Sequence, residues 1–299
     1  MPERKKVFFI INKFSGTGYR PEVEGRIIDR SSQLGYVCTI EFTQYPGHAT
    51  ELARQAVKEN FKIVFAMGGD GTVNEVAQGL VHTDTVLAIL PKGSGNGLAR
   101  HLRIPMKFTH ALELLAHHQV IDMDTFLING QLSVNVSGIG FDGHVANLFG
   151  KDGKRGLMTY GKIVMAEFGP FKEFQVDITI DGKRMTRNSF ILAFANSSQF
   201  GNDAKIAPFA SVCDQQMDVC FIKKVPLTQM IGFVAKMFTG KLEQSAFVEI
   251  IKARKVSATF SSPVPYHIDG EGRTSSDAFE MEMQPCSLKM MVPAHLSGF

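Results

Sequence analysis

The sequence has no tryptophan, few cysteines and no long apolar run. Its four cysteines form no C-x-x-C pair and have no histidine at a ligand spacing, which argues against a zinc site or a disulfide framework: Cys38, Cys213, Cys220 and Cys286. No stretch approaches the roughly 18–20 apolar residues of a membrane-spanning helix. The first apolar run, Val7–Ile11, is too short for a secretory signal. We therefore expect a cytoplasmic protein whose contact with lipid is peripheral.

The net charge is also small. Lys and Arg number 32 against 29 Asp and Glu, which gives a formal charge of +3 over 299 residues. A nucleic-acid-binding surface usually needs a dense basic stripe, so nucleic acid is not an expected partner. A weak positive charge is compatible with transient contact with an anionic membrane surface. The apolar fraction of 44% is that of a globular protein, and the length suggests about two domains.

The first 122 residues alternate strand and helix patterns. Apolar runs typical of buried strands occur four times: Val7–Asn12, Tyr36–Phe42, Phe61–Met67 and Val86–Leu90. Helical spacing follows them over about 21–34, 49–57 and 73–80, near residue 98, and over 108–118. This alternation implies right-handed crossovers and a parallel sheet. We therefore expect an α/β nucleotide-binding domain over residues 1–122.

From residue 123 to 299 the pattern changes to β-rich. Phe279, Met281 and Met283 alternate with polar neighbours, which is typical of antiparallel strands with one wet face. Turn pairs separate such runs at Asp181-Gly182 and Asp269-Gly270. Further strands are expected at Gln175–Ile180, Phe190–Ala195, Val219–Ile222 and Val256–Phe260, and one helix at about 227–238.

The strongest local signal is the loop Gly68–Thr72, between a buried strand and a helix. Its glycines let the backbone approach a ligand, and a helix N-terminus attracts anions. Thr72 and Glu75 have the spacing of a capping box. We expect this loop to bind phosphate. The carboxylate of Asp70 would repel phosphate unless a cation or a proton lies between them, so Asp70 indicates Mg²⁺ or base chemistry. A tight turn with a capping acid is the alternative.

A second Gly-rich turn, Lys92–Gly97, follows the next strand. Two strand–loop–helix units in succession line one crevice at the carboxyl edge of a parallel sheet. Lys92 and Arg100 could balance phosphate charge or be solvated loop charges. The polar loop Asn12–Gly16, after the first strand, is expected at the same edge.

Five segments, in order along nearly the whole chain, resemble motifs of the diacylglycerol kinase catalytic domain family, which includes bacterial lipid kinases, sphingosine kinases and ceramide kinases. They are INKFSGTG, GGDGTVNEV, LPKGSGNGLAR, VNVSGIGFDGHV and HIDGE. GGDGT alone is shared with NAD kinases and phosphofructokinases, but the set of five is far more specific. The resemblance implies an ATP-dependent lipid kinase of phospholipid biosynthesis. It also implies an antiparallel, sandwich-like lipid domain over 123–299, ATP in the cleft between the domains, and a last strand that can return to the first domain.

The resemblance also implies site residues. Nucleotide contacts are expected at Asn12, Ser15, Gly16, Thr43, Gly68, Gly69, Gly71, Thr72, Asn74, Ser94 and Asn96. Catalytic acids are expected at Glu271, Asp269 and Asp70, with Glu271 accepting the proton of the lipid hydroxyl. Asp70 and Asp124 are expected to hold Mg²⁺ through water. Asp214 falls in a loop that resembles a structural metal site of bacterial members, although Gln215 stands where the family often has glycine.

The sequence gives fewer signals for residues that contact the lipid. Asp142, in a Gly-rich turn, could pair with an amine or hydrogen-bond a hydroxyl, or be a simple turn acid. The segment 141–174 interleaves phenylalanines with basic residues, which favours a membrane-facing lip: Phe141, Phe149, Phe168, Phe171 and Phe174, with Lys151, Lys154, Arg155 and Lys162.

Several alternatives stay open. The SGNGLA form of the second Gly-rich turn is similar to sphingoid-base kinases, which leaves the acceptor lipid open: diacylglycerol, a sphingoid base, phosphatidylglycerol or another lipid. An NAD kinase-like small-molecule kinase and a non-catalytic nucleotide- or lipid-binding regulator are the competing functions. The SGNGLA and HIDGE segments argue against the first, and the intact acids against the second. The oligomeric state is open, with a homodimer as one option.

Overall fold

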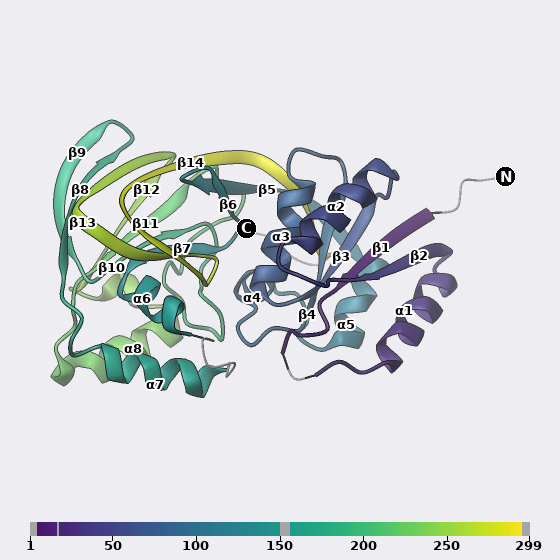
Figure 1. Ribbon diagram of the computed structural model, residues 1–299, viewed down its shortest axis with the longest axis horizontal. Helices are drawn as coiled ribbons and strands as arrows, with labels where there is room; N and C mark the ends of the chain where they lie inside the picture. Colours follow the sequence, from purple (N-terminus) through teal and green to yellow (C-terminus); the bar gives the residue numbers. More distant parts are fainter. Residues whose placement is uncertain (1–4, 17, 150–155, 295–299) are drawn as a thin grey trace. The chain divides into compact units, whose positions relative to one another are not determined.

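The computed structural model describes residues 5–16, 18–149 and 156–294, and the chain divides into two compact units (Figure 1). Unit 1 comprises residues 1–123 and 286–299, and unit 2 comprises residues 124–285. Two strands, β5 (His118–Ile128) and β14 (Glu271–Pro293), contribute residues to both units. Among the helices within these ranges, none is long and apolar enough to cross a bilayer.

Unit 1 is built on a parallel sheet with the strand order β4-β3-β1-β2. Its strands are β1 (Lys5–Ile11), β2 (Tyr36–Phe42), β3 (Ile63–Gly68) and β4 (Val86–Pro91). Every residue of β3 and the last five of β1 are buried, as expected for strands covered on both faces. The prediction of an α/β domain with a parallel sheet is confirmed.

The helices of unit 1 are α1 (Glu22–Gln33), α2 (His48–Lys58), α3 (Asp70–Leu80), α4 (Gly97–His101) and α5 (Phe108–Leu112), with a 3₁₀ turn η1 (Glu113–Leu115). The helix predicted over 108–118 ends early because β5 already begins at His118.

The predicted capping box of α3 is wrong. The N-cap of α3 is Gly69, and no described side chain caps this end. Thr72 Oγ1 instead accepts a hydrogen bond from Asn12 Nδ2 at 3.1 Å. Glu75 Oε2 accepts one from the backbone N–H of Ala49 at 3.3 Å, near the start of α2. Both side chains thus form hydrogen bonds with residues distant in sequence instead of capping α3.

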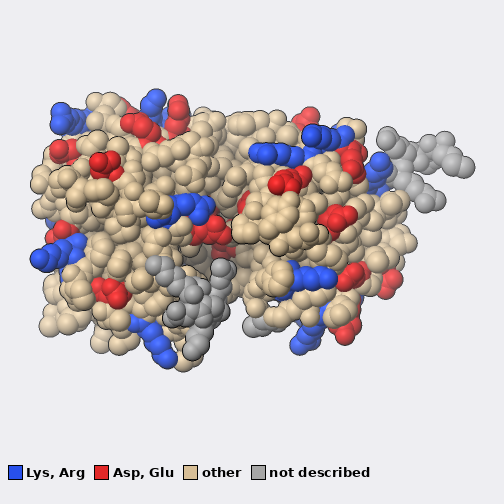
Figure 2. Space-filling model, viewed as in Figure 1, with Lys and Arg blue, Asp and Glu red and all other residues tan. Residues whose placement is uncertain are grey.

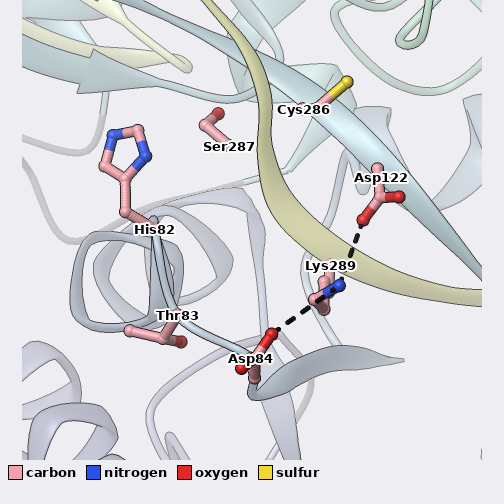
Figure 3. A pocket seen from close by; sticks show the side chains of 7 residues that line it. All are labelled: His82, Thr83, Asp84, Asp122, Cys286, Ser287 and Lys289. Carbon is pink, nitrogen blue, oxygen red and sulfur yellow. Dashed lines mark hydrogen bonds and ion pairs between the residues drawn. The ribbon is translucent and has the colours of Figure 1, made fainter.

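The end of β14 completes the sheet of unit 1. It runs parallel to β4, with Met290 opposite Leu87, and its apolar side chains are fully buried: Leu288, Met290, Met291 and Val292. The backbone N–H of His82 donates to Ser287 O at 2.7 Å. Lys289 Nζ lies 3.8 Å from Asp84 Oδ1 and 3.4 Å from Asp122 Oδ1 (Figure 3). The end of β14, far along the chain, is therefore part of the core of unit 1.

These contacts border a depression of about 410 Å³ in unit 1, lined by the residues drawn in Figure 3. The depression includes Asp84, which precedes the first residue of β4, Val86. It therefore lies toward the amino end of that strand, away from the edge where the Gly-rich loops leave the sheet. Because of this position we do not assign phosphate binding to it.

Unit 2 is an antiparallel β structure. Besides parts of β5 and β14, its strands are β6 (Gln131–Ser133), β7 (Val136–Gly140), β8 (Phe174–Ile180), β9 (Lys183–Ser189), β10 (Ile191–Ala195), β11 (Met217–Ile222), β12 (Val248–Ala253) and β13 (Lys255–Ile268). The strands β12, β11, β10, β7 and β13 are neighbours in that order, and β13 also pairs with β8 and β14. Its helices are α6 (Phe141–Leu148), α7 (Leu157–Glu167) and α8 (Met230–Thr239), and the short 3₁₀ turns η2 (Leu227–Gln229) and η3 (Leu242–Gln244) flank α8. The predicted β-rich second domain is confirmed.

Local patterns in unit 2 were predicted well where they depend on alternation or on a turn. Phe279, Met281 and Met283 are buried, and the intervening glutamates are exposed. Asp181-Gly182 and Asp269-Gly270 both have positive φ at each position, as type I′ hairpin turns require. β13 and β14 are much longer than predicted because they pair along most of their length with a register shift between Thr259 and Val264.

The phenylalanines predicted to form a lip over 141–174 lie in a core instead. Phe141, Phe168 and Phe171 pack around Phe190, with ring centroids 4.6–5.9 Å apart. The segment contains α6 and α7, and these rings form the small apolar core that joins the two helices to the sheet. Three of the basic residues of the proposed lip lie outside the described residues: Lys151, Lys154 and Arg155.

Replacing Leu288 by alanine tests the contribution of the returning strand. Leu288 is fully buried, so the loss of its side chain should lower the free energy of unfolding by about 2–5 kcal/mol. Urea unfolding of the whole chain, followed by circular dichroism, measures the shift. Lys289→Ala is the matched control because its ion pairs are partly exposed, and its cost should stay below about 1 kcal/mol. Equal costs for the two variants would contradict a core role for this strand.

Candidate functional site

The loops that follow β1, β2, β3 and β4 meet at one edge of the unit 1 sheet. The strands are parallel, so their carboxyl ends lie together. Backbone hydrogen bonds join the loops there: Asn12 N donates to Met67 O at 2.9 Å, Thr43 N to Ile11 O at 3.0 Å, and Lys92 N to Gly68 O at 2.8 Å. The structure thus brings the predicted nucleotide-binding segments of unit 1 to a single edge.

The two Gly-rich loops touch through their backbones. A Cβ atom added to Gly93 would lie 2.5 Å from Gly69 Cα, which is far closer than a real Cβ contact. Gly16 has a φ of +63°, and its Cβ would lie 1.9 Å from the carbonyl oxygen of Lys92. Only glycine fits at these contacts, so the three loops form one close-packed backbone surface.

Helix α3 begins on this surface at Asp70. With no described side chain as its cap, its N-terminal N–H groups and the positive end of its dipole suit an anionic ligand. Asp70 and Gly71 are half-buried, so they are still reached by solvent. A partly exposed carboxylate beside an anion site has the hard oxygen donors that Mg²⁺ prefers.

Lys92 joins the loop after β4 to the loop after β1. Its Nζ donates to the carbonyl oxygens of Ser15 and Lys13, the latter at 3.4 Å. Burial lowers the pKa of its ammonium group from the ordinary value for lysine. Of the two roles open for Lys92 from sequence, that of a solvated loop charge is wrong, because the ammonium is bound by backbone carbonyls.

Several predicted nucleotide-binding residues shape the loops with their side chains. Asn96 has a φ of +52°, accepts a hydrogen bond from Gly93 N at 2.9 Å and donates one to Gly93 O at 2.8 Å. Asn74 is buried and its Oδ1 accepts from Gln78 Nε2 at 2.7 Å. Ser94 is exposed. The side chain of Asn96 therefore fixes the conformation of its loop, that of Asn74 bonds within α3, and Ser94 is accessible.

In unit 2 the HIDGE segment forms the hairpin turn between β13 and β14. Asp269 is almost fully buried, and its carboxylate accepts hydrogen bonds from Ser133 Oγ at 2.6 Å, Val134 N at 2.9 Å and Asn135 N at 3.0 Å. These bonds fasten the turn to the segment between β6 and β7. Glu271 begins β14 beyond this anchor with 53% of its side chain exposed, and its Oε2 lies 3.4 Å from Arg273 Nη1.

A buried histidine supports the same turn from the other side. His267 Nδ1 accepts a hydrogen bond from Gly270 N at 3.1 Å, so the proton of the neutral ring lies on Nε2. Nε2 lies 3.3 Å from Asp142 Oδ2 and donates to it. Sequence reasoning missed His267, and the one signal for it was its place in HIDGE, two residues before Asp269.

Asp142 lies under the hairpin rather than on an open surface. It is 4% exposed, and its Oδ1 accepts from Gly143 N at 2.8 Å. A Cβ at Gly138 would lie 1.8 Å from Asp142 Oδ2, so this neighbour must be glycine. Burial, together with the negative charge of Asp142, raises the pKa of the Tyr160 hydroxyl well above its ordinary value. This geometry favours a supporting role for Asp142 over direct contact with a lipid.

Asp124 and Asp214 both bind the loop 214–216. Asp124 is fully buried and its Oδ2 accepts from Gln215 N at 2.6 Å, and Asp214 Oδ1 accepts from Gln216 N at 3.1 Å. The other oxygen of Asp214 is paired with the ammonium of Lys252. Burial, opposed by Lys252 and reinforced by Asp214, raises the pKa of Asp218 to about 6.

This arrangement fits an internal ion pair better than a divalent cation, because Lys252 already supplies the positive charge beside Asp214. Among the residues that the structure describes, no three His, Cys, Asp or Glu side chains form a cluster able to hold a metal ion. Asp124 and Asp214 therefore both contact the loop 214–216, which belongs to unit 2.

Comparison with known proteins agrees with both units. The sequence model of the diacylglycerol kinase catalytic domain matches residues 6–128, and that of the YegS C-terminal NAD kinase beta sandwich-like domain matches residues 135–292. A diacylglycerol kinase of Bacillus subtilis is 26% identical over 275 residues, which cover 89% of this chain and 90% of that protein. A diacylglycerol kinase of Staphylococcus carnosus is 21% identical, over 90% of this chain and 89% of that protein.

The fold is also similar to a solved structure. The crystal structure of a diacylglycerol kinase from Bacillus anthracis superimposes with a TM-score of 0.77 at 21% identity, and the match covers 99% of this chain and all of that one. The two domain matches, together with the Gly-rich loops and the HIDGE turn, show that this chain belongs to the diacylglycerol kinase catalytic domain family of lipid kinases.

Proposed function

We propose that this protein is an ATP-dependent lipid kinase that transfers the γ-phosphoryl group to a hydroxyl of diacylglycerol or a sphingoid base. The observation that carries the proposal is the backbone contact between Gly69 and Gly93 beside the start of α3. It presents two Gly-rich loops and a helix N-terminus on one surface, which suits a polyphosphate. The names of the relatives, diacylglycerol kinases, support the lipid acceptor.

In this proposal the phosphates lie against the backbone of residues 68–71 and 93–95, and Ser15 and Thr43 border the site. Phosphoryl transfer depends mainly on position and charge, so a rigid backbone surface is the principal contribution of unit 1. The contacts of Lys92 and Asn96 within the loops supply that rigidity.

Glu271 is the proposed acceptor of the proton from the lipid hydroxyl. Its carboxylate is half exposed, whereas the neighbouring carboxylate of Asp269 is consumed by three hydrogen bonds. We therefore assign the chemistry to Glu271 and treat Asp269, His267 and Asp142 as positioning residues that hold its turn.

Asp70 is proposed to hold the Mg²⁺ ion that accompanies ATP, through water. Asp124, which sequence suggested for the same ion, is fully buried and bound to Gln215 N, so we do not assign it to the ion. When bound, this ion would neutralise negative charge on the transferred phosphate. We propose that the reaction takes place at the cytoplasmic surface of a membrane, in phospholipid biosynthesis. The lipid acceptor and the low cysteine content support this location.

Labelled ATP tests the proposed reaction. The protein should transfer ³²P from γ-labelled ATP, with Mg²⁺, to a lipid in mixed micelles that contain diacylglycerol and sphingosine. Glu271→Gln should lower kcat by about 10²–10⁴-fold, because the hydroxyl proton loses its acceptor. The KM for ATP should stay within a factor of about two, since Glu271 lies outside the Gly-rich loops.

Glu280→Gln is the matched control, since Glu280 is an exposed acid on the same strand and should leave kcat unchanged. A folded Glu271→Gln enzyme with undiminished turnover would contradict the role of that residue. Label in a soluble nucleotide, with none in lipid, would instead indicate an NAD kinase-like enzyme. ATP binding without transfer to either would indicate a regulator.

The backbone contact between the loops is tested by Gly93→Ala. The added methyl group would collide with Gly69, so the loops must separate and the KM for ATP should rise about tenfold or more. Steady-state kinetics at saturating lipid measure this change. Gly25→Ala is the control: this helical glycine has open space around it, so the substitution should leave KM unchanged and cost no stability. An unchanged KM in Gly93→Ala would contradict the proposed phosphate surface.

A further inference from the structure

Helix α8 and the turn before it expose an apolar stripe that the fold of unit 2 does not use. The stripe consists of Leu227, Ile231, Val234 and Phe238, whose exposed fractions are 77%, 85%, 37% and 45%. Their spacing of three to four residues puts them on one helical face. Phe233 and Met237 point to the other side, where they pack against the core that includes Ile206 and Leu242. The helix is therefore apolar on both faces, and the described residues cover one of them.

A second exposed group lies on α7. Met158 and Met165 are 79% and 83% exposed. The residues after α7 are tied to those before η2, because Lys224 Nζ donates to Gly169 O at 2.9 Å and to Phe171 O at 2.6 Å. Figure 1 draws α7 and α8 at the same lower corner of unit 2, and Figure 2 shows the face of the molecule in front of them. The exposed methionines are thus a second apolar group, on the helix whose end is tied by Lys224 to the start of the α8 segment.

The charged residues of the segment that carries the stripe have one sign. The segment from Lys223 to Lys241, which contains η2 and α8, carries four lysines and no aspartate or glutamate. Lys223 and Lys241 are exposed, one near each end of the stripe. Lys236 Nζ donates to the carbonyl oxygen of Gln244 at 2.8 Å. Exposed apolar side chains flanked by lysines are typical of a helix that lies in the interface of an anionic bilayer.

We propose that the face formed by η2, α8 and the exposed methionines of α7 docks this protein on an anionic lipid bilayer. Leu227, Ile231 and Phe238 enter the boundary between headgroups and acyl chains, and the flanking lysines bind anionic headgroups. A symmetric contact between two copies is disfavoured, because it would bring the lysines of one copy against those of the other with no acid in the segment. The inference rests on the proposed lipid kinase function and names the surface through which that enzyme reaches its acceptor.

Vesicle binding tests the surface directly. The full chain should co-sediment with vesicles of phosphatidylglycerol and phosphatidylcholine, and much less with phosphatidylcholine alone. The double variant Ile231→Glu/Phe238→Glu should bind the anionic vesicles at least about tenfold more weakly, because it loses apolar contacts and repels the headgroups. The control Ile28→Glu/Val37→Glu changes two exposed apolar residues of unit 1 and should bind as the wild type does.

Kinetics separate this surface from the proposed function. The double variant should phosphorylate a short-chain acceptor dissolved as monomers at the wild-type rate, and a long-chain acceptor in vesicles at least tenfold more slowly. If the wild type bound vesicles through this face but phosphorylated neither acceptor, the docking surface would stand and the kinase function would fail.

Equal vesicle binding by wild type and the double variant would overturn the proposal. So would a wild-type dimer in light scattering that the double variant converts to monomers without any vesicle binding, because the face would then be a contact between copies.

Discussion

The backbone contact between Gly69 and Gly93 is the constraint on which the organisation of unit 1 depends. It exists because β3 and β4 are parallel neighbours whose following loops each have a glycine at the point of contact. A side chain at Gly93 would separate the loops and open the surface at the start of α3. Gly16 extends the same constraint to the loop after β1, where Lys92 closes the arrangement by binding backbone carbonyls. Other side-chain contacts at this edge, such as those of Asn96 with Gly93 and of Asn12 with Thr72, stabilise a shape that the glycines allow.

In unit 2 the site depends on side chains instead of backbone contacts: buried polar residues hold the turn that carries the exposed acid Glu271. Asp269 fastens the hairpin turn through three hydrogen bonds, and His267 connects the same turn to Asp142. Buried carboxylates are costly unless each is hydrogen-bonded, and both aspartates meet this condition. The turn that carries Glu271 is therefore held from two sides, while Glu271 itself stays open to solvent. Such support from rigid neighbours is what a proton acceptor needs in order to meet a hydroxyl in one orientation.

Features that depend on neighbouring residues in the chain could be predicted from sequence. The strands of unit 1 are apolar runs followed by glycine, and the turns at Asp181 and Asp269 are encoded by Asp-Gly pairs. Features that depend on distant partners could not. Thr72 and Glu75 have the spacing of a capping box but bind Asn12 and Ala49, and the phenylalanines after Phe141 form a core instead of a lip. Similarly, the Gly-rich turn that contains Asp142 gives no indication of His267, which pairs with Asp142 from β13. The sequence predicts the helix α8 but not its exposed stripe, because the exposure of a side chain depends on the folded chain.

The central claim is that ATP binds where the two Gly-rich loops touch. Amide hydrogen exchange, measured by mass spectrometry with and without a non-hydrolysable ATP analogue and Mg²⁺, tests it most directly. The account predicts slower exchange in segments 68–74 and 92–97, and unchanged exchange at 82–84 and 286–289 around the depression on the other edge of the sheet. Slower exchange at 82–84 and 286–289, with none at the Gly-rich loops, would contradict it.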